Sequence, residues 1–345
     1  MFLKSVLRNW LFLFFEKLTK NYSNNWNLFI ITIKYERVSY MITRNVLDIL
    51  PETIKKEVAG RSNSGEIQEI RIKANKPLMF IGNHGEIKSD YISKLDDVKN
   101  IIQRISSYSI YAFEEELRQG YITIEGGHRV GICGTCVLDG QSLKTIKNIS
   151  SLNIRVAKDI KGCANGVLPH IIKDNSILNT IIISPPRCGK TTLLRDIARQ
   201  ISNGSSNVRG KHITIVDERS EIAACYRGTP QMEVGIRTDV LDNCPKSEGI
   251  IMAIRSMGPQ VIICDEIGTY KDMDSIVAAL NSGVNVITTI HGFDEEDLYK
   301  RPVFKELIEN KVFKRAIVLS NKRGIGTVEY IYDFTKGKIL GEVDL

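Results

Sequence analysis

Residues 181–192, IIISPPRCGKTT, hold the groups that a phosphate-binding loop requires. Gly189, Lys190 and Thr191 form the Gly-Lys-Thr end of a Walker A motif, in which backbone N–H groups and the lysine bind phosphate oxygens. The motif ordinarily opens with glycine where this chain has Ser184. Serine is small, and a strand, a loop and a helix are expected here in that order, so the pattern predicts a nucleotide site. The residues expected to line it are Ser184, Pro185, Pro186, Arg187, Cys188, Gly189, Lys190, Thr191 and Thr192.

Residues 261–268, VIICDEIG, supply a second motif. This apolar run ends in Asp265 and Glu266, the form of a Walker B strand. In that arrangement Asp265 and the Thr191 hydroxyl hold Mg²⁺, and Glu266 polarises the attacking water. A strand that simply ends in a solvated acidic pair is the plainer interpretation. Asp265 lies 75 residues after Lys190, and this position favours a catalytic role for the acidic pair. The two motifs together therefore predict Mg²⁺-dependent nucleotide hydrolysis.

Two further strands are expected to end at the same edge of the sheet. The run 212–217 leads into Asp217 and Glu218, and the run 284–292 contains His291 near its end. Parallel strands place their carboxyl ends together, and α/β proteins bind ligands there. We therefore expect Glu218 and His291 in the catalytic site, with His291 sensing the γ-phosphate or orienting water. A neutral histidine that caps a strand is the alternative for His291.

The order of these strands distinguishes classes of nucleotide-binding protein. One strand, at 212–217, lies in the sequence between the Walker A and Walker B strands, which is typical of RecA-type motor ATPases and not of kinases or small GTPases. Residues 320–324, SNKRG, lack the aspartate with which GTPases read guanine. ATP is therefore the predicted nucleotide.

The elements that must position these residues fall into two parts. From residue 178 onward, apolar runs alternate with helical patterns, which predicts a parallel sheet covered on both faces and, after 314, an antiparallel meander. Residues 41–160 mix short strands and helices, as in a small α+β domain. We predict an α/β chain with an N-terminal α+β domain (41–160), a linker helix (161–177) and a RecA-like P-loop ATPase domain (178–345).

The N-terminal part carries clear local signals. Residues 66–82 read as two strands separated by a turn at 74–77, and Gly126-Gly127 marks a hairpin. Helical spacing covers 93–109 and 111–120. The pair Cys133 and Cys136 has no second Cys pair nearby, so we expect two small residues on a buried strand and neither zinc nor redox chemistry.

Charge and cysteine content exclude several classes of protein. The 345 residues carry a net charge of +7, but residues 1–40 alone account for +4. The remaining +3 does not favour nucleic-acid binding. Seven scattered cysteines argue against a disulfide framework and for a reducing cytosol.

The segment 1–40 is basic and rich in aromatic residues. Its apolar runs are too short to span a membrane. One interpretation is a helix lying on a membrane surface. We favour the other, that translation starts at Met41 and the segment is upstream reading frame, because the domain pattern begins just after Met41.

Several motifs together resemble the stage III sporulation protein AA family of endospore-forming bacteria, relatives of the type II and type IV secretion ATPases. The matching stretches are EIRIKANKPL (69–78), GYITIEGGHRVGICGTCV (120–137), NIRVAKDIKG (153–162), SPPRCGKTTLLRDIAR (184–199), VDERSEIAA (216–224), MGPQVIICDEIGT (257–269) and ITTIHG (287–292). The Ser-Pro-Pro opening resembles that family's own phosphate loop. In the secretion ATPases proper, a glycine commonly occupies the position of Asp265.

The resemblance implies a role as well as a fold. It implies a hexameric ATPase in the mother-cell cytoplasm, peripheral to a membrane complex that connects mother cell and forespore, with the integral membrane proteins of that channel complex as partners. It places an acidic box at VDERSE and a histidine box at TIHG. It also makes Arg129 and Arg155 the better candidates to approach a neighbour's nucleotide, ahead of three other arginines: Arg227, Arg237 and Arg255.

Two other functions remain possible from the sequence. A RecA-like core also drives nucleic-acid-dependent ATPases, although aromatic residues are not interleaved with Lys and Arg as single-strand binding requires. The third possibility is a scaffold that binds ATP to order a ring and hydrolyses it negligibly; Glu266 argues against it.

Overall fold

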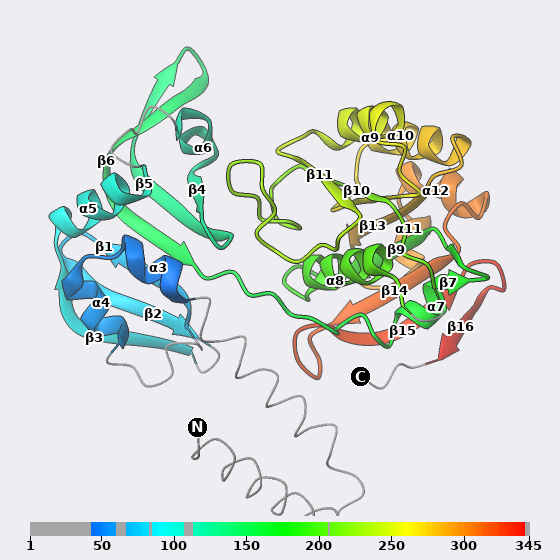
Figure 1. Cartoon of the computed structure of the whole chain (residues 1–345), viewed down its shortest axis with the longest axis horizontal. Helices are drawn as coiled ribbons and strands as arrows, with labels where there is room; N and C mark the ends of the chain where they lie inside the picture. The colour runs from blue at the N-terminus through cyan, green and yellow to red at the C-terminus, as the bar shows by residue number, and fades with distance from the viewer. Residues whose placement is uncertain (1–42, 60–66, 83–84, 107–112, 206–207, 342–345) are drawn as a thin grey trace, which may run out of the picture.

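The computed structural model describes residues 43–59, 67–82, 85–106, 113–205 and 208–341, which form two large sheets with their helices and a small two-stranded sheet (Figure 1). The segment 1–40 and its two interpretations lie outside the described residues. No helix in the described part of the chain is long and apolar enough to cross a membrane. All seven cysteines lie in the described ranges, and all are free thiols.

The N-terminal sheet has six strands in the order β3-β2-β1-β6-β5-β4, and every neighbouring pair is antiparallel. Four helices accompany it, and the isoleucine-rich side of the strands packs with them into one core. The strands are β1 (Ile67–Lys73), β2 (Lys76–Gly82), β3 (Gly85–Ser93), β4 (Tyr121–Ile124), β5 (His128–Asp139) and β6 (Ser142–Arg155), and the helices are α3 (Thr43–Ile49), α4 (Glu52–Ala59), α5 (Leu95–Ile105) and α6 (Glu114–Gln119).

The hairpin of β4 and β5 turns at Gly126 and Gly127, as the sequence predicts. The expectation for Cys133 and Cys136 is half wrong. Both lie on β5, but in a stretch where the long β5–β6 hairpin extends beyond the core, so both side chains are exposed. Strand alternation alone could not show that this end of the hairpin lacks a covering layer.

The connection between the two sheets is held by one aspartate. Residues 158–167 lead into α7 (Leu168–Ile171), whose first turn contains Pro169 as predicted, and then into the short strands β7 (Ile172–Lys173) and β8 (Ser176–Ile177). The buried Asp196 carboxylate accepts the backbone N–H groups of Gly162 at 2.9 Å and Ala164 at 2.8 Å. The incoming chain is thereby fixed to the side of α8 (Lys190–Asn203).

The C-terminal sheet has eight strands in the order β11-β10-β12-β13-β9-β14-β15-β16. The first six are parallel, and the last two add the predicted antiparallel meander. Central strands such as β9, TIIIS, are buried along their whole length, because helices cover both faces. The strands are β9 (Thr180–Ser184), β10 (Ile213–Asp217), β11 (Thr238–Asp242), β12 (Val261–Cys264), β13 (Asn285–His291), β14 (Arg315–Ser320), β15 (Thr327–Asp333) and β16 (Lys338–Gly341).

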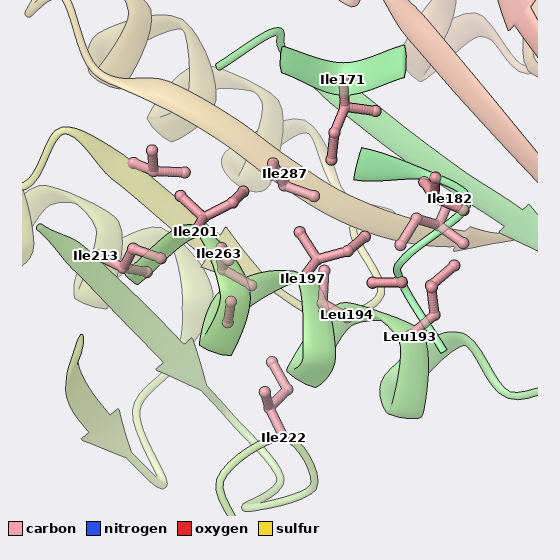
Figure 2. Close-up of a cluster of buried hydrophobic side chains, with 14 of the residues drawn as sticks. Ile171, Ile182, Leu193, Leu194, Ile197, Ile201, Ile213, Ile222, Ile263 and Ile287 are labelled. Carbon is pink, nitrogen blue, oxygen red and sulfur yellow. The ribbon is translucent and has the colours of Figure 1, made fainter. Parts of the chain in front are cut away.

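Two hydrophobic cores lie on opposite faces of this sheet. On one face α8 packs Leu194, Ile197 and Ile201 against strand residues such as Ile182 and Ile263 (Figure 2). On the other face α9 (Lys246–Ser256), α10 (Tyr270–Asn281), α11 (Glu296–Tyr299) and α12 (Pro302–Glu309) form the second core. Helix α8 is therefore rigidly seated, and its first turn stands at the carboxyl edge of the strands.

The spatial order of the strands differs from their order in the sequence. The strand between the Walker A strand β9 and the Walker B strand β12 is β13, which follows both in the sequence. The strand β10, which lies between them in the sequence, lies on the outer side of β12. Beyond it lies β11, TDVLD, which the sequence did not reveal because it lacks a run of buried apolar residues.

The loop after β10 is shaped by a buried carboxylate. Asp217 accepts the backbone N–H groups of Glu221, Ile222 and Ala223 at 2.8, 2.9 and 2.9 Å. Burial raises the pKa of Asp217 to about 6, and Asp242 adds to the shift while these hydrogen bonds oppose it. The chain is turned back on itself here, with Ser220 in the left-handed conformation at φ 52°.

Replacing Asp196 by Ala should lower the free energy of unfolding by about 2–4 kcal/mol, because the backbone N–H groups of buried Ala164 and partly buried Gly162 lose their acceptor. Urea unfolding measures the change. Asp274→Ala, at an exposed position on α10, is the control and should change stability by less than about 0.5 kcal/mol. Equal effects at the two positions would contradict the role given to Asp196.

Asp217 should make stability fall as pH rises from about 4 to about 6. The unfolded carboxyl loses its proton near pH 4, whereas the folded one keeps it until about pH 6, so the folded state binds more protons in this window. The loss amounts to about 3 kcal/mol at most. Urea unfolding at pH 4.5 and 7 should show a smaller pH dependence for Asp217→Asn than for the wild type, and an unchanged one for the exposed control Asp239→Asn.

Candidate nucleotide-binding site

The predicted phosphate loop joins β9 to α8. Ser184 is the last residue of β9 and is fully buried, and its hydroxyl donates to the Pro185 carbonyl at 2.8 Å. The serine that replaces the expected glycine therefore satisfies its own hydroxyl locally. Gly189 has φ 87°, and a Cβ atom there would lie 3.2 Å from the Cα atom of Gly326, so this position requires glycine.

Lys190 lies at the centre of the loop and is buried. Its ammonium group donates to the carbonyl oxygens of Ser184 and Pro185, both at 3.3 Å, and lies 2.9 Å from Nδ1 of His291. Burial lowers its pKa, which the Asp265 and Glu266 carboxylates oppose. No acidic side chain among the described residues lies within ion-pair distance of the ammonium group. This buried cation could therefore bind an anion such as phosphate.

Asp265 and Thr191 form the candidate metal site. The Thr191 hydroxyl donates to Oδ2 of Asp265 at 3.0 Å, and the Thr289 hydroxyl donates to Oδ1. A carboxylate and a hydroxyl oxygen, completed by phosphate and water oxygens, suit Mg²⁺, which binds through few protein ligands. No cluster of three or more His, Cys, Asp or Glu residues that could hold a metal occurs in the described ranges.

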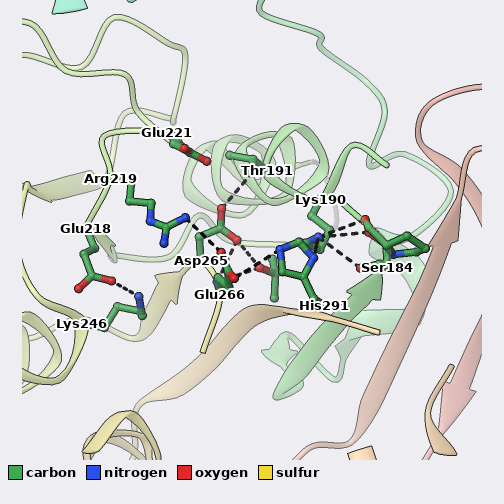
Figure 3. Close-up of polar contacts among 12 residues, drawn as sticks. Ser184, Lys190, Thr191, Glu218, Arg219, Glu221, Lys246, Asp265, Glu266 and His291 are labelled. Carbon is green, nitrogen blue, oxygen red and sulfur yellow. Dashed lines mark hydrogen bonds and ion pairs between the residues drawn. The ribbon is translucent and has the colours of Figure 1, made fainter. Parts of the chain in front are cut away.

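Glu266 follows directly and adopts an unusual backbone conformation, with φ 42°. Its N–H group donates to Oδ1 of Asp265 and to the Thr289 hydroxyl, both at 2.9 Å, and these bonds hold the residue in this conformation. Its carboxylate lies 3.4 Å from Nε2 of His291 and 3.5 Å from Nη1 of Arg219 (Figure 3).

His291 connects the lysine to the glutamate. A lysine ammonium group can only donate, so Nδ1 of His291 accepts from Lys190 and the ring proton is on Nε2, which faces Glu266. The strand end of β13 thus places one imidazole between the phosphate-binding cation and the acid of the Walker B motif. Figure 3 shows the four side chains Lys190, His291, Glu266 and Arg219 in one row.

We expected Glu218 of the acidic box to reach the site, but the structure brings Arg219 of the same loop there. Glu218 forms an ion pair with Lys246 and points away from Glu266. Arg219 is the residue of this loop that contacts Glu266. Sequence reasoning missed Arg219, although an arginine inside a run of acids, DERSE, was a signal that it has a fixed partner.

The two arginines of the N-terminal sheet are placed differently. Arg129 pairs with Glu221 at 3.0 Å and donates to the Arg219 carbonyl oxygen, and its guanidinium lies 4.1 Å above the Tyr121 ring. The Tyr121 hydroxyl donates to the same carbonyl at 3.3 Å. Arg155, the cross-strand neighbour of Arg129, instead pairs with Glu69 at 3.6 Å and is mostly exposed.

The other candidate arginines have local partners. Arg227 stacks on Tyr226, Arg237 donates to the Ser202 carbonyl oxygen, and Arg255 lines a groove between α9 and α10. Within this chain, the structure therefore brings Arg129 to the loop beside Glu266 and leaves the others away from it.

The fold has known counterparts. The structure is similar to the ATPase DotB of Legionella pneumophila, with a TM-score of 0.55 and 14% identity, covering 82% of this chain and 81% of that one. It is also similar to the pilus retraction motor PilT, solved with bound ADP, with a TM-score of 0.52, 14% identity and coverage of 76% of both chains. At this identity the similarity shows the fold alone, which is the RecA-like P-loop fold of secretion ATPases, preceded by a smaller α+β domain as predicted.

Sequence comparison is more specific. The family model described as "Sporulation stage III, protein AA" matches residues 41–340. The stage III sporulation protein AA of Bacillus subtilis (strain 168) is 46% identical over 290 residues, which cover 84% of this chain and 94% of that protein. The resemblance seen in the motifs is thereby confirmed over nearly the whole chain after Met41, and this chain belongs to the sporulation stage III protein AA family.

Proposed function

We propose that this chain is a Mg²⁺-dependent ATPase. The observation that carries the proposal is the convergence of Lys190, the Thr191–Asp265 pair and Glu266 with His291 at one edge of the sheet. The similarity in fold to a motor solved with bound ADP supports a nucleotide ligand. Adenine remains the proposed base, because the sequence lacks the guanine-reading aspartate.

The residues have separate roles in this proposal. Lys190 and the backbone N–H groups of residues 187–191 bind the β- and γ-phosphates, and the γ-phosphate takes the place of the carbonyl oxygens around the lysine. Glu266 orients the attacking water, and His291 holds Glu266 through its Nε2 proton while sensing the phosphate through Lys190. Mg²⁺ would be held by Thr191 and Asp265 and would neutralise charge on the phosphates.

Glu218 keeps a positioning role in this proposal. Its ion pair with Lys246 at the start of α9 fixes the loop that carries Arg219. Arg129 is proposed as the N-terminal arginine that responds to nucleotide, because its partners Glu221 and Arg219 belong to the same loop. Arg155, exposed and 3.6 Å from Glu69, is available to a neighbouring copy of the chain.

Family membership and fold support a proposal for the cellular role. We propose that residues 41–160 and 178–345 are domains joined by 161–177, that ATP binding and hydrolysis move one against the other, and that six copies form a ring. This ring would energise a membrane complex between mother cell and forespore from the mother-cell cytoplasm, with integral membrane proteins as partners and no nucleic acid.

Replacing Glu266 by Gln should lower the rate of ATP hydrolysis by about 10²–10⁴-fold while ATP binding is retained, because the amide keeps the shape but cannot polarise water. Steady-state phosphate release and ATP titration measure the two quantities. Glu309→Gln, on the exposed pair with Lys305, is the matched control and should hydrolyse ATP like the wild type.

Light scattering with and without ATP reports the assembly, and added single-stranded DNA tests dependence on nucleic acid. Wild-type protein that binds ATP but turns it over no faster than Glu266→Gln would contradict the ATPase proposal and leave ATP as a structural ligand of a scaffold. Hydrolysis that requires single-stranded DNA would replace the secretion role with a nucleic-acid-dependent one.

A further inference from the structure

The carboxylate of Glu266 has one partner facing each of its two oxygens (Figure 3). Nε2 of His291 lies 3.4 Å from Oε1, and Nη1 of Arg219 lies 3.5 Å from Oε2. Both separations are longer than an ordinary hydrogen bond, and the Glu266 side chain is 42% exposed, so water still reaches the carboxylate. Its orientation is therefore set by two groups, of which His291 is fixed by its strand and Arg219 stands on a loop.

The loop is anchored on both sides of Arg219. Before it, the Glu218 carboxylate pairs with Lys246 of α9. After it, the buried Arg195 of α8 donates to the carbonyl oxygen of Glu221 at 2.8 Å. These anchors belong to the C-terminal domain and leave the position of Arg219 itself to a different set of contacts.

Those contacts come from the N-terminal sheet and end on the carbonyl oxygen of Arg219. The hydroxyl of Tyr121, on β4, donates to this oxygen at 3.3 Å, and the guanidinium of Arg129, on β5, donates to it as well. Because the carbonyl group and the side chain extend from the same Cα atom, fixing the carbonyl limits where the Arg219 guanidinium can reach. One hairpin of the other domain thus holds the residue that faces Glu266.

Folding stability does not account for this arrangement. The Arg219 side chain is 69% exposed, and an ion pair between exposed groups contributes little to the free energy of folding. A carboxylate that activates water has a stricter requirement, because a small misplacement of a catalytic group lowers the rate strongly. The Arg219–Glu266 pair meets that requirement only while the backbone of Arg219 is held.

We propose that Arg219 is a positioning residue for Glu266, and that the N-terminal domain controls the alignment of Glu266 through the backbone of Arg219. This inference rests on the proposed function and adds a regulation of the same site to it. With the domains placed as in this structure, the β4–β5 hairpin holds Arg219, and Glu266 has both partners. When the domains move apart, the carbonyl oxygen loses its two donors and Glu266 keeps His291 alone.

Steady-state ATP hydrolysis by the full chain over a range of ATP concentrations tests the role of the side chain. Arg219→Gln should lower kcat by about tenfold and leave KM nearly unchanged, because the guanidinium meets Glu266 and not the phosphates. Arg219→Lys should recover most of the lost rate, since it restores a positive charge on the same stem. Arg301→Gln, at an exposed arginine between α11 and α12, is the matched control and should change neither quantity.

A double-mutant cycle tests the control by the N-terminal domain. Tyr121→Phe removes the hydroxyl that binds the Arg219 carbonyl and keeps the ring beneath the Arg129 guanidinium. It should lower kcat by about threefold in the wild type and have no effect in the Arg219→Gln background, because the hydroxyl acts on Glu266 only through Arg219.

Four outcomes would overturn the inference. They are an Arg219→Gln variant with the kcat of the wild type, one that raises KM alone, a lysine variant as slow as the glutamine variant, and a Tyr121→Phe effect of equal size in both backgrounds. Wild-type protein that hydrolyses ATP no faster than Glu266→Gln would instead overturn the proposed function, and the inference with it. Circular dichroism checks folding, and Arg219→Met, which keeps the aliphatic stem, replaces the glutamine variant if that variant unfolds.

Discussion

The carboxylate of Asp265 receives hydrogen bonds from three separate segments of the C-terminal domain, and the site depends on this convergence. Thr191 comes from the first turn of α8, Thr289 from the end of β13, and the N–H group of Glu266 from the chain after β12. Each donor fixes one component relative to the others: the phosphate loop, the histidine strand and the acid. The cost of partly burying a carboxylate beside β12 is offset because its oxygens accept hydrogen bonds from three directions.

The sequence allowed prediction of the parts whose signals are local. The Walker A and Walker B motifs are each contiguous in the sequence. The burial of an apolar strand such as β9 can be predicted from its own residues. The order of strands in the sheet is not a local property, and for this reason the place of β13 between β9 and β12 was not predicted. The loop after β10 shows a second limit: residues 218 and 219 lie beyond the strand, where strand alternation no longer applies, and Arg219, not Glu218, contacts Glu266.

Contacts between the two domains were beyond prediction for a related reason. Arg129 and Glu221 are 92 residues apart and lie on different sheets, and nothing in either segment indicates the other. The carbonyl oxygen of Arg219 accepts from Arg129 and Tyr121, while the side chain of the same residue meets Glu266. One residue therefore has its backbone held by the N-terminal domain and its side chain at the Walker B acid, which is a direct physical connection between the domains and the site.

The backbone of Glu266 has a consequence for how this protein can vary. A residue with a Cβ atom in the left-handed region costs about 1 kcal/mol relative to glycine, and hydrogen bonds from its N–H group hold it there. Selection for stability alone would favour glycine at this position, and glycine would remove the carboxylate. Under the proposed hydrolysis, the demands of folding and of chemistry oppose each other at a single residue, and a chain without that activity would gain stability by losing this side chain.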